Sequence, residues 1–276
     1  LTAGSSMAGA GTVTVSGGVV TVDAPVTLST LALSSGTLGG TGNVTVTDLN
    51  WSAGTLTGSG AFTVGASGHG LGLSGNGTAV LDGRTLTLAP GSTNAMSGTV
   101  FLRLDNGAVV NNNGSFTASG TNNQITHAIG AVGAFNNSGT LVKSASGSTF
   151  TIANAFNNSG TVNVNAGTLS LSVAGPTTNS GTVNLTQGST YQTTAGALIN
   201  DGVIAGSGTL STTGGFTNNG TLRPGGSNAT GILNTTGNLT LGASSVLEID
   251  IGPTAAQFDA VVVAGSATLN GALNVS

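Results

Sequence analysis

Short segments in which apolar and polar residues alternate recur along the whole chain. Examples are Thr12–Val15 (TVTV), Asn43–Val46 (NVTV), Thr161–Val164 (TVNV) and Asn238–Leu241 (NLTL). Alternation with a period of two over so few residues predicts short β-strands with one buried face. The segments between them are rich in Gly, Asn and Ser, which favour turns. The pattern therefore predicts an all-β chain built from many short strands.

The turn sequences themselves repeat. The dipeptide Gly-Thr begins at positions 36, 54, 77, 98, 120, 139, 160 and 181, a mean step of about 20 residues. Phe135–Leu141 (FNNSGTL) returns almost unchanged as Phe156–Val162 (FNNSGTV) and Thr177–Val183 (TTNSGTV). A repeat of this length is too short for a βαβ unit or a propeller blade. It fits one coil of a parallel β-helix.

We therefore expect residues 1–276 to form one continuous β-solenoid, a single-stranded parallel β-helix with coils of about 18–23 residues. Residues 1–30 and 242–276 follow the repeat less closely, so we expect less regular terminal coils there. Each strand should pair with the same strand one coil later, about 4.8 Å away. We expect Gly and Asn at the corners because these residues tolerate positive φ.

Four asparagines recur at a constant interval that matches the length of one repeat: Asn137, Asn158, Asn179 and Asn200. Stacked coils would place them above one another, which predicts a ladder of side-chain amides. The alternative is a turn preference without side-chain stacking. Phe135 and Phe156 share the same interval, so we expect their rings to stack inside the solenoid.

Charge is scarce, with 4 Lys+Arg and 8 Asp+Glu residues. So few cations exclude a nucleic-acid binder or a polybasic membrane patch. Intrinsic disorder usually combines low hydrophobicity with high net charge, whereas this chain is 38% hydrophobic with a net charge of −4. Cysteine is absent, and no apolar run approaches the length of a membrane-spanning helix, so we expect no membrane insertion by this chain.

The charged residues include two pairs with the same internal spacing. The interval from Asp82 to Arg103 equals the interval from Arg84 to Asp105, and both equal the spacing of the four asparagines. One coil would therefore bring Asp82 to Arg103 and Arg84 to Asp105. Such a cluster could be an active site, but a surface network of ion pairs is the interpretation that we favour.

Other candidates for chemistry are isolated in the sequence. His69 and His127 have no carboxylate within a few residues and no His or Asp at their own position one coil away, so we interpret both as solvated surface residues. Glu248, Asp250 and Asp259 could bind a cation, but the calcium-binding nonapeptide and EF-hand patterns are absent. We expect no catalytic residue, no cofactor and no metal site.

Three segments resemble a known group of proteins. Gly36–Val46 (GTLGGTGNVTV), Asn158–Val164 (NSGTVNV) and Phe258–Val275 (FDAVVVAGSATLNGALNV) are similar to passenger regions of bacterial autotransporters and filamentous-haemagglutinin-type adhesins. The resemblance implies a secreted, right-handed β-helix at the bacterial cell surface. The membrane barrel of an autotransporter does not follow Ser276 in this sequence, so we do not expect the chain to anchor itself.

These observations predict a non-catalytic extracellular structural protein, a stiff solenoid in a bacterial surface filament, sheath or adhesin stalk. Leu1–Gly11 and Gly265–Ser276 lack a charged block or an amphipathic helix that would cap a solenoid. We therefore expect either head-to-tail self-association or continuation in a longer passenger. A host or surface glycan is a further partner that such a role allows.

Two alternatives remain open from the sequence. A polysaccharide-binding or polysaccharide-cleaving β-helix should carry aromatic residues, and this chain has one Trp and one Tyr, Trp51 and Tyr191. An ice-binding solenoid should carry Thr-x-Thr at a fixed place in every coil. The Thr-x-Thr segments that begin at Thr12, Thr45 and Thr85 do not recur at one coil interval.

Overall fold

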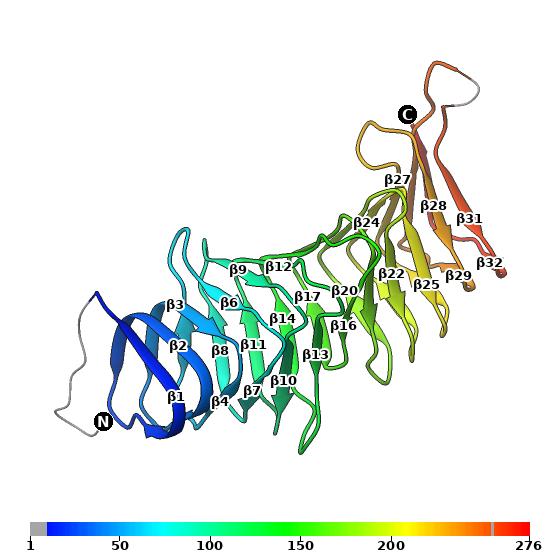
Figure 1. Cartoon of the computed structure of the whole chain (residues 1–276). Helices are drawn as coiled ribbons and strands as arrows, with labels where there is room; N and C mark the ends of the chain where they lie inside the picture. Colours follow the sequence, from blue (N-terminus) through cyan, green and yellow to red (C-terminus); the bar gives the residue numbers. More distant parts are fainter. Residues whose placement is uncertain (1–9, 255–256) are drawn as a thin grey trace. The chain divides into compact units, whose positions relative to one another are not determined.

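The computed structural model describes residues 10–254 and 257–276, and these form 33 strands and no helix (Figure 1). The strands stack in parallel in a solenoid of about 12 turns, which confirms the predicted parallel β-helix. Most coils contribute three short strands, so that each strand pairs with the third strand after it. The chain forms two compact units, Leu1–Leu141 with Thr151–Ala155 and Val142–Phe150 with Phe156–Ser276.

The first unit has three strand-bearing faces. The early strands β1 (Thr12–Thr21), β2 (Val26–Gly39) and β3 (Val44–Trp51) are long and pass from one face to the next. One face contains β4 (Gly54–Thr57), β7 (Thr78–Asp82), β10 (Phe101–Asp105) and β13 (Gln124–Thr126). The second contains β5 (Phe62–Val64), β8 (Thr85–Leu88), β11 (Val109–Asn112) and β14 (Ala134–Asn137). The third contains β6 (Leu71–Leu73), β9 (Thr93–Met96) and β12 (Ser115–Ala118).

The second unit is also three-faced. One face contains β18 (Thr161–Val164), β21 (Thr182–Leu185), β24 (Val203–Gly206), β27 (Thr221–Pro224), β30 (Val246–Ile249) and β33 (Ala272–Val275). The next contains β19 (Thr168–Leu171), β22 (Thr190–Thr193), β25 (Thr209–Thr212), β28 (Ile232–Thr235) and β31 (Ala260–Val263). The third contains β20 (Thr177–Asn179), β23 (Leu198–Asn200), β26 (Phe216–Asn218), β29 (Leu239–Leu241) and β32 (Ala267–Thr268). Residues of both units occur in β15 (Thr140–Lys143), β16 (Thr149–Ile152) and β17 (Ala155–Asn158).

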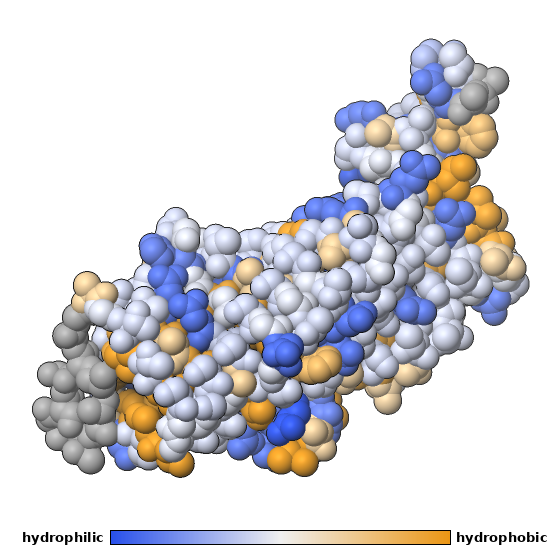
Figure 2. Space-filling view, in the orientation of Figure 1, coloured by the Kyte–Doolittle hydropathy of each residue, from blue (hydrophilic) through white to orange (hydrophobic). Residues whose placement is uncertain are grey.

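The core consists of inward side chains that repeat from coil to coil. In the first unit Leu33, Trp51 and Leu73 are in register on successive coils, and all three are fully buried. Outward positions alternate with them and carry mainly Thr, Ser and Asn. Figure 2 shows the result, because residues of intermediate hydropathy cover most of the visible surface. The period-two pattern of the sequence is therefore the inside-outside alternation of the coils.

Coil length varies more than the sequence repeat indicates. Val44 is in register with Val26 and with Phe62, so two successive coils lie at the short end of the predicted range. Asn112 is in register with Asn137, which lies 25 positions later and makes this coil longer than predicted. The strands keep their register while the corner loops absorb the difference in length. The upper limit of the predicted range was therefore too low.

The glycines two positions after Asn179, Asn200 and Asn218 have a different role from the expected one. Gly181, Gly202 and Gly220 do not have positive φ, and neither do the asparagines that precede them. A Cβ atom on Gly202 would lie 2.0 Å from the carbonyl oxygen of Gly181, and one on Gly220 would lie 2.1 Å from that of Gly202. Glycine is required here because neighbouring coils approach too closely for a side chain. Positive φ does occur at other corners, for example at Gly188 (φ 79°).

Candidate functional site

A ladder of asparagine side chains lies in the interior of the second unit. Asn158 donates from Nδ2 to Oδ1 of Asn179, which donates to Asn200, which donates to Asn218, over distances of 2.7, 2.7 and 2.6 Å. All four residues are buried and in register on successive coils. The first unit contains one step of the same kind, from Nδ2 of Asn112 to Oδ1 of Asn137, at 2.7 Å.

Each ladder amide also binds the corner that follows it. The Nδ2 atoms of Asn179, Asn200 and Asn218 donate to the carbonyl oxygen two residues later, over 3.0, 3.1 and 2.9 Å. A buried amide without partners would cost about 1–3 kcal/mol. In the second unit the ladder satisfies these amides and ties each corner to the next coil, whereas Oδ1 of Asn112 in the first unit is buried without a hydrogen-bond partner among the described residues.

Two members of the ladder were missed in the sequence. Asn112 precedes Asn137 by 25 positions and Asn218 follows Asn200 by 18, so neither fits the interval of 21 that joins Asn158 to Asn179. The signal that could have found them is the local sequence, since Asn112 and Asn218 both begin the tripeptide Asn-Asn-Gly.

The column is apolar beyond these members. Leu88 is in register with Asn112, and Leu241 is in register with Asn218. Both leucines are buried. The ladder therefore occupies a limited stretch of an inward column that is otherwise hydrophobic.

The two predicted stacking phenylalanines are both buried, Phe135 with 0% and Phe156 with 4% of its surface exposed. Phe135 belongs to the first unit and Phe156 to the second. In the first unit Phe135 packs edge-to-face against Phe116, with ring centroids 5.4 Å apart. Both rings serve as core residues of their own units.

The predicted crosswise ion pairs do not form. Strands β7 and β10 pair with Asp82 in register with Asp105 and with Val80 in register with Arg103. Arg103 instead pairs with Asp105 on its own strand, with Nε 2.6 Å from Oδ2. The step between the Gly-Thr signals at Gly77 and Gly98 is shorter than the step between the paired strand residues, which explains the wrong register.

Arg84, the fourth member of the predicted cluster, points into the solenoid. It is 1% exposed and donates hydrogen bonds to the carbonyl oxygens of Gly60, Thr57 and Gly42. Its guanidinium also lies 5.3 Å from the ring centroid of Phe62. Burial lowers the pKa of Arg84 from its ordinary value. The residue satisfies corner carbonyls of earlier coils, a structural role.

Lys143 is a second buried cation. Its Nζ atom donates to the carbonyl oxygen of Ala145 and to Oγ of Ser148, the latter at 3.0 Å. The residue is 0% exposed, and burial lowers the pKa of its ammonium group. Like Arg84, it holds a corner of the backbone from the inside.

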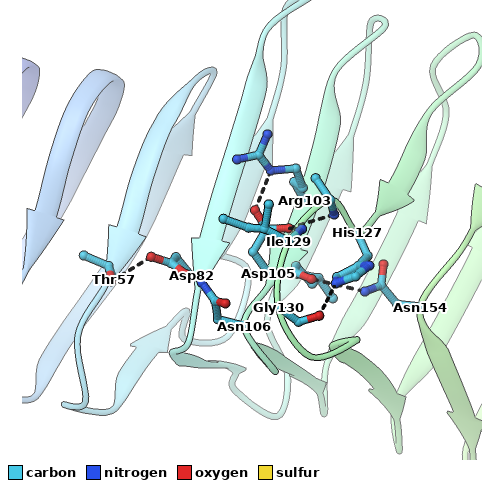
Figure 3. Close-up of polar contacts among 11 residues, drawn as sticks. Thr57, Asp82, Arg103, Asp105, Asn106, His127, Ile129, Gly130 and Asn154 are labelled. Carbon is cyan, nitrogen blue, oxygen red and sulfur yellow. Dashed lines mark hydrogen bonds and ion pairs between the residues drawn. The ribbon is translucent and has the colours of Figure 1, made fainter.

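Asp105 forms the most elaborate polar cluster of the first unit (Figure 3). Its buried carboxylate accepts the Arg103 bond at Oδ2 and the backbone N–H groups of Ala128 and Ile129 at Oδ1, at 2.9 and 3.3 Å. His127 closes the same loop through a 3.0 Å contact between Nε2 and the carbonyl oxygen of Gly130. The two backbone bonds and the His127 contact position the loop after β13, while the Arg103 bond holds the carboxylate from its own strand, so the cluster fixes backbone.

Asp82 lies at the edge of this cluster. Its carboxylate accepts hydrogen bonds from Asn106 Nδ2 and from Thr57 Oγ1. Asn106 has a φ of 51° and begins the turn after β10. Asp82 therefore stabilises this turn and the coil before it.

His69 is not isolated, contrary to the interpretation from the sequence. Its Nδ1 atom lies 3.0 Å from Oδ2 of Asp48, and Oδ1 of Asp48 accepts the backbone N–H of Gly70 at 3.1 Å. The two residues lie 21 positions apart on adjacent coils, which is the interval that also separates the repeated asparagines. The sequence therefore did carry the signal for this contact, and the interpretation that no Asp lies one coil from His69 was wrong. About half of the His69 side chain (53%) is exposed, so the pair is a surface contact.

The acidic residues near the C-terminal end of the second unit have separate partners. Glu248 pairs with Arg223, whose pKa is raised chiefly by this hydrogen bond. Asp259 accepts the backbone N–H groups of Gly231 and Asp250, at 2.7 and 3.0 Å. Oδ1 of Asp250 accepts from Ser276 Oγ. Among the described residues no group of three or more His, Asp or Glu side chains could hold a metal ion.

Comparison of the chain with protein-family models, with curated proteins and with solved structures finds no match. In the part of the chain that the structure describes, no helix has the length and hydropathy needed to cross a membrane. The class that the structure defines is therefore the β-solenoid, a repeat protein whose buried polar side chains bind the corners of its own coils.

Proposed function

We propose that this chain is a non-catalytic extracellular structural protein, a stiff β-solenoid of a bacterial surface filament, sheath or adhesin stalk. The observation that carries the proposal is the use of its polar side chains. The asparagine ladder, Arg84, Lys143 and Asp105 all hold backbone corners in place. Such a molecule resists bending and cutting, which suits a protein that must span a distance outside a cell. Its resemblance to autotransporter passengers and filamentous-haemagglutinin-type adhesins agrees with this role.

Resistance to proteases follows from the placement of the basic residues. Lys and Arg together number four. Arg84 and Lys143 are buried, while Arg103 and Arg223 are ion-paired on strands β10 and β27. A trypsin-like protease needs an exposed basic residue in a segment that can leave its strand. The folded chain offers it almost none.

Trypsin digestion tests the proposal. We expect the folded chain to be cleaved at least about 100-fold more slowly than the urea-unfolded chain, because cleavage must wait for opening of paired coils. The variant Gln187→Lys is the positive control, since it places a cation among the exposed loop residues 186–188. Cleavage of the native chain after Arg84 or Lys143 at the rate of the unfolded chain would contradict the proposal.

The two alternative functions have less support. Trp51 and Tyr191 are both 0% exposed, so neither can stack on a polysaccharide. Burial also raises the pKa of the Tyr191 hydroxyl, which removes it as an acid or base. Outward columns of threonine do exist, for example Thr27, Thr45, Thr63 and Thr87 in register in the first unit and Thr168, Thr190 and Thr209 in the second. The positions two residues after the second column are Ser170, Gln192 and Ser211, and no unbroken row of threonine lies beside the first, so neither of these columns has the second parallel row of Thr-x-Thr that an ice-binding face requires.

The last described coil supports association through further coils. Leu273 and Val275 are in register with Leu247 and Ile249, yet they are 63% and 56% exposed. A second copy stacked head-to-tail, or a longer passenger, would cover them. Electron microscopy of the isolated chain tests head-to-tail stacking. Filaments are expected if copies stack in this way, and dispersed monomers would argue against it.

A further inference from the structure

The second unit carries a groove of about 760 Å³ that none of the roles above uses. It lies at one corner of three successive coils. The corner loops there are residues 186–189, 207–208 and 225–231, so that a short corner lies between two longer ones. The short corner at residues 207–208 therefore lies lower than the two longer loops on either side of it. Ser207 and Thr209 form the floor, and Gln187 and Thr230 lie in the walls.

Both walls are held in place by hydrogen bonds. In the first wall, Ser189 donates from its backbone N–H and from Oγ to the carbonyl oxygen of Thr186, at 3.1 and 2.8 Å. In the second, Gly225 N–H donates to Gly206 and Gly231 N–H donates to the buried Asp259 carboxylate, at 3.0 and 2.7 Å. The groove is thus formed before any ligand arrives, which lowers the entropic cost of binding.

The lining selects one class of ligand. No charged side chain of the described residues lines the groove, which disfavours phosphates, nucleic acids and charged peptides. Hydroxyl and amide groups of Thr209, Asn234 and Gln187 can both donate and accept hydrogen bonds. Ile232, which is 46% exposed, adds an apolar contact next to them. Such a mixture suits a molecule that carries many hydroxyl groups around a C–H surface.

The backbone argues against a peptide ligand. The bordering strands β24 and β25 are each paired on both sides, β24 with β21 and β27 and β25 with β22 and β28. They have no free edge to which an extended peptide could add. The volume lies within the usual range for small-molecule sites. We propose that this groove binds a short neutral oligosaccharide through hydrogen bonds and the Ile232 contact, without the aromatic stacking that Trp51 and Tyr191 cannot provide, a binding function beyond the structural role and independent of it.

The test uses the full chain and three neutral probes, cellohexaose, maltohexaose and chitohexaose, in NMR titrations of the backbone amides. We expect at least one of them to give saturable shifts at Gln187, Ser207 and Thr209. The variant Thr209→Phe fills the floor from an outward strand position and should weaken binding at least tenfold. Thr178→Phe, an exposed strand position on another face of the same unit, is the matched control and should bind like wild type.

Three outcomes would overturn the proposal: no saturable shifts with any of the three probes, binding that survives Thr209→Phe, or tighter binding of hexagalacturonate than of the neutral sugars. If Thr209→Phe does not fold, Gln187→Glu in the exposed wall gives the same comparison by introducing a charge. Trypsin resistance and filament formation do not depend on the groove. A failure of oligosaccharide binding would therefore not affect the proposed structural role, which those two measurements test.

Discussion

Replacing one member of the asparagine ladder should destabilise the second unit. Asn179 is the best position, because Oδ1 accepts from Asn158 and Nδ2 donates to Asn200, Gly181 and Val203. In Asn179→Leu, Asn200 Oδ1 loses its donor inside the core, at a cost of about 1–3 kcal/mol. The other lost bonds cost about 2 kcal/mol together. Burial of the leucine returns about 1 kcal/mol. The expected loss of unfolding free energy is therefore about 2–4 kcal/mol.

Urea unfolding followed by circular dichroism measures this loss. The matched control is Asn184→Leu, because Asn184 is exposed and its amide bond to Asn163 lies on the outer surface of the same coils. We expect less than about 0.5 kcal/mol there. If Asn179→Leu and Asn184→Leu have the same free energy of unfolding within that margin, the interior ladder does not stabilise the second unit.

The whole ladder, the corner glycines and the buried Lys143 can each be tested by substitution. Asn158, Asn179, Asn200 and Asn218 can be replaced together by Leu. The loss of unfolding free energy per residue, measured in urea, should be smaller than for Asn179→Leu alone, because no amide is then left without a partner. An equal or larger loss per residue would show that the amides do not act as a unit. Gly202→Ala should lower the thermal unfolding midpoint by more than Gly188→Ala. The new Cβ would lie 2.0 Å from the Gly181 carbonyl oxygen, whereas nothing lies within 4 Å at Gly188. The opposite order would show that the positive φ of Gly188 matters more than the close contact at Gly202. Burial lowers the pKa of Lys143 below 10.5, so the folded chain loses this proton at a lower pH than the unfolded chain does. The free energy of unfolding should therefore rise with pH between the folded pKa and 10.5. Urea unfolding of Lys143→Met should lack this rise, and an identical pH dependence in both proteins would refute the prediction.

The fold could be predicted from the sequence because its strongest signal is local. Alternation such as that in Thr161–Val164 and the repeated Asn-Ser-Gly-Thr corner each define one strand or one turn. The constant asparagine interval also predicted the contacts of Asn158, Asn179 and Asn200, because the coils have that same length there.

Register between distant coils could not be predicted in the same way, because it depends on the lengths of all corner loops. The coil from β7 to β10 is longer than the Gly-Thr spacing beside it, which moved Arg103 away from Asp82. The contact between His69 and Asp48, by contrast, could have been predicted, because the two residues are separated by the same 21-residue interval as the asparagines. The inward direction of Arg84 and Lys143 was also hidden, since charged residues are usually exposed.

Coils stacked in register bring outward residues of successive coils close together, and a pair of spin labels measures that proximity. Asn163 and Asn184 are outward positions in register on adjacent coils of the second unit. Cysteine replacements there can be labelled selectively because the chain has no other cysteine. We expect strong dipolar broadening of the frozen spectrum, because the two backbones lie about 5 Å apart. Labels at Asn163 and Thr178, on different faces, should give much weaker broadening. Equal, weak broadening for both pairs would contradict the stacked solenoid.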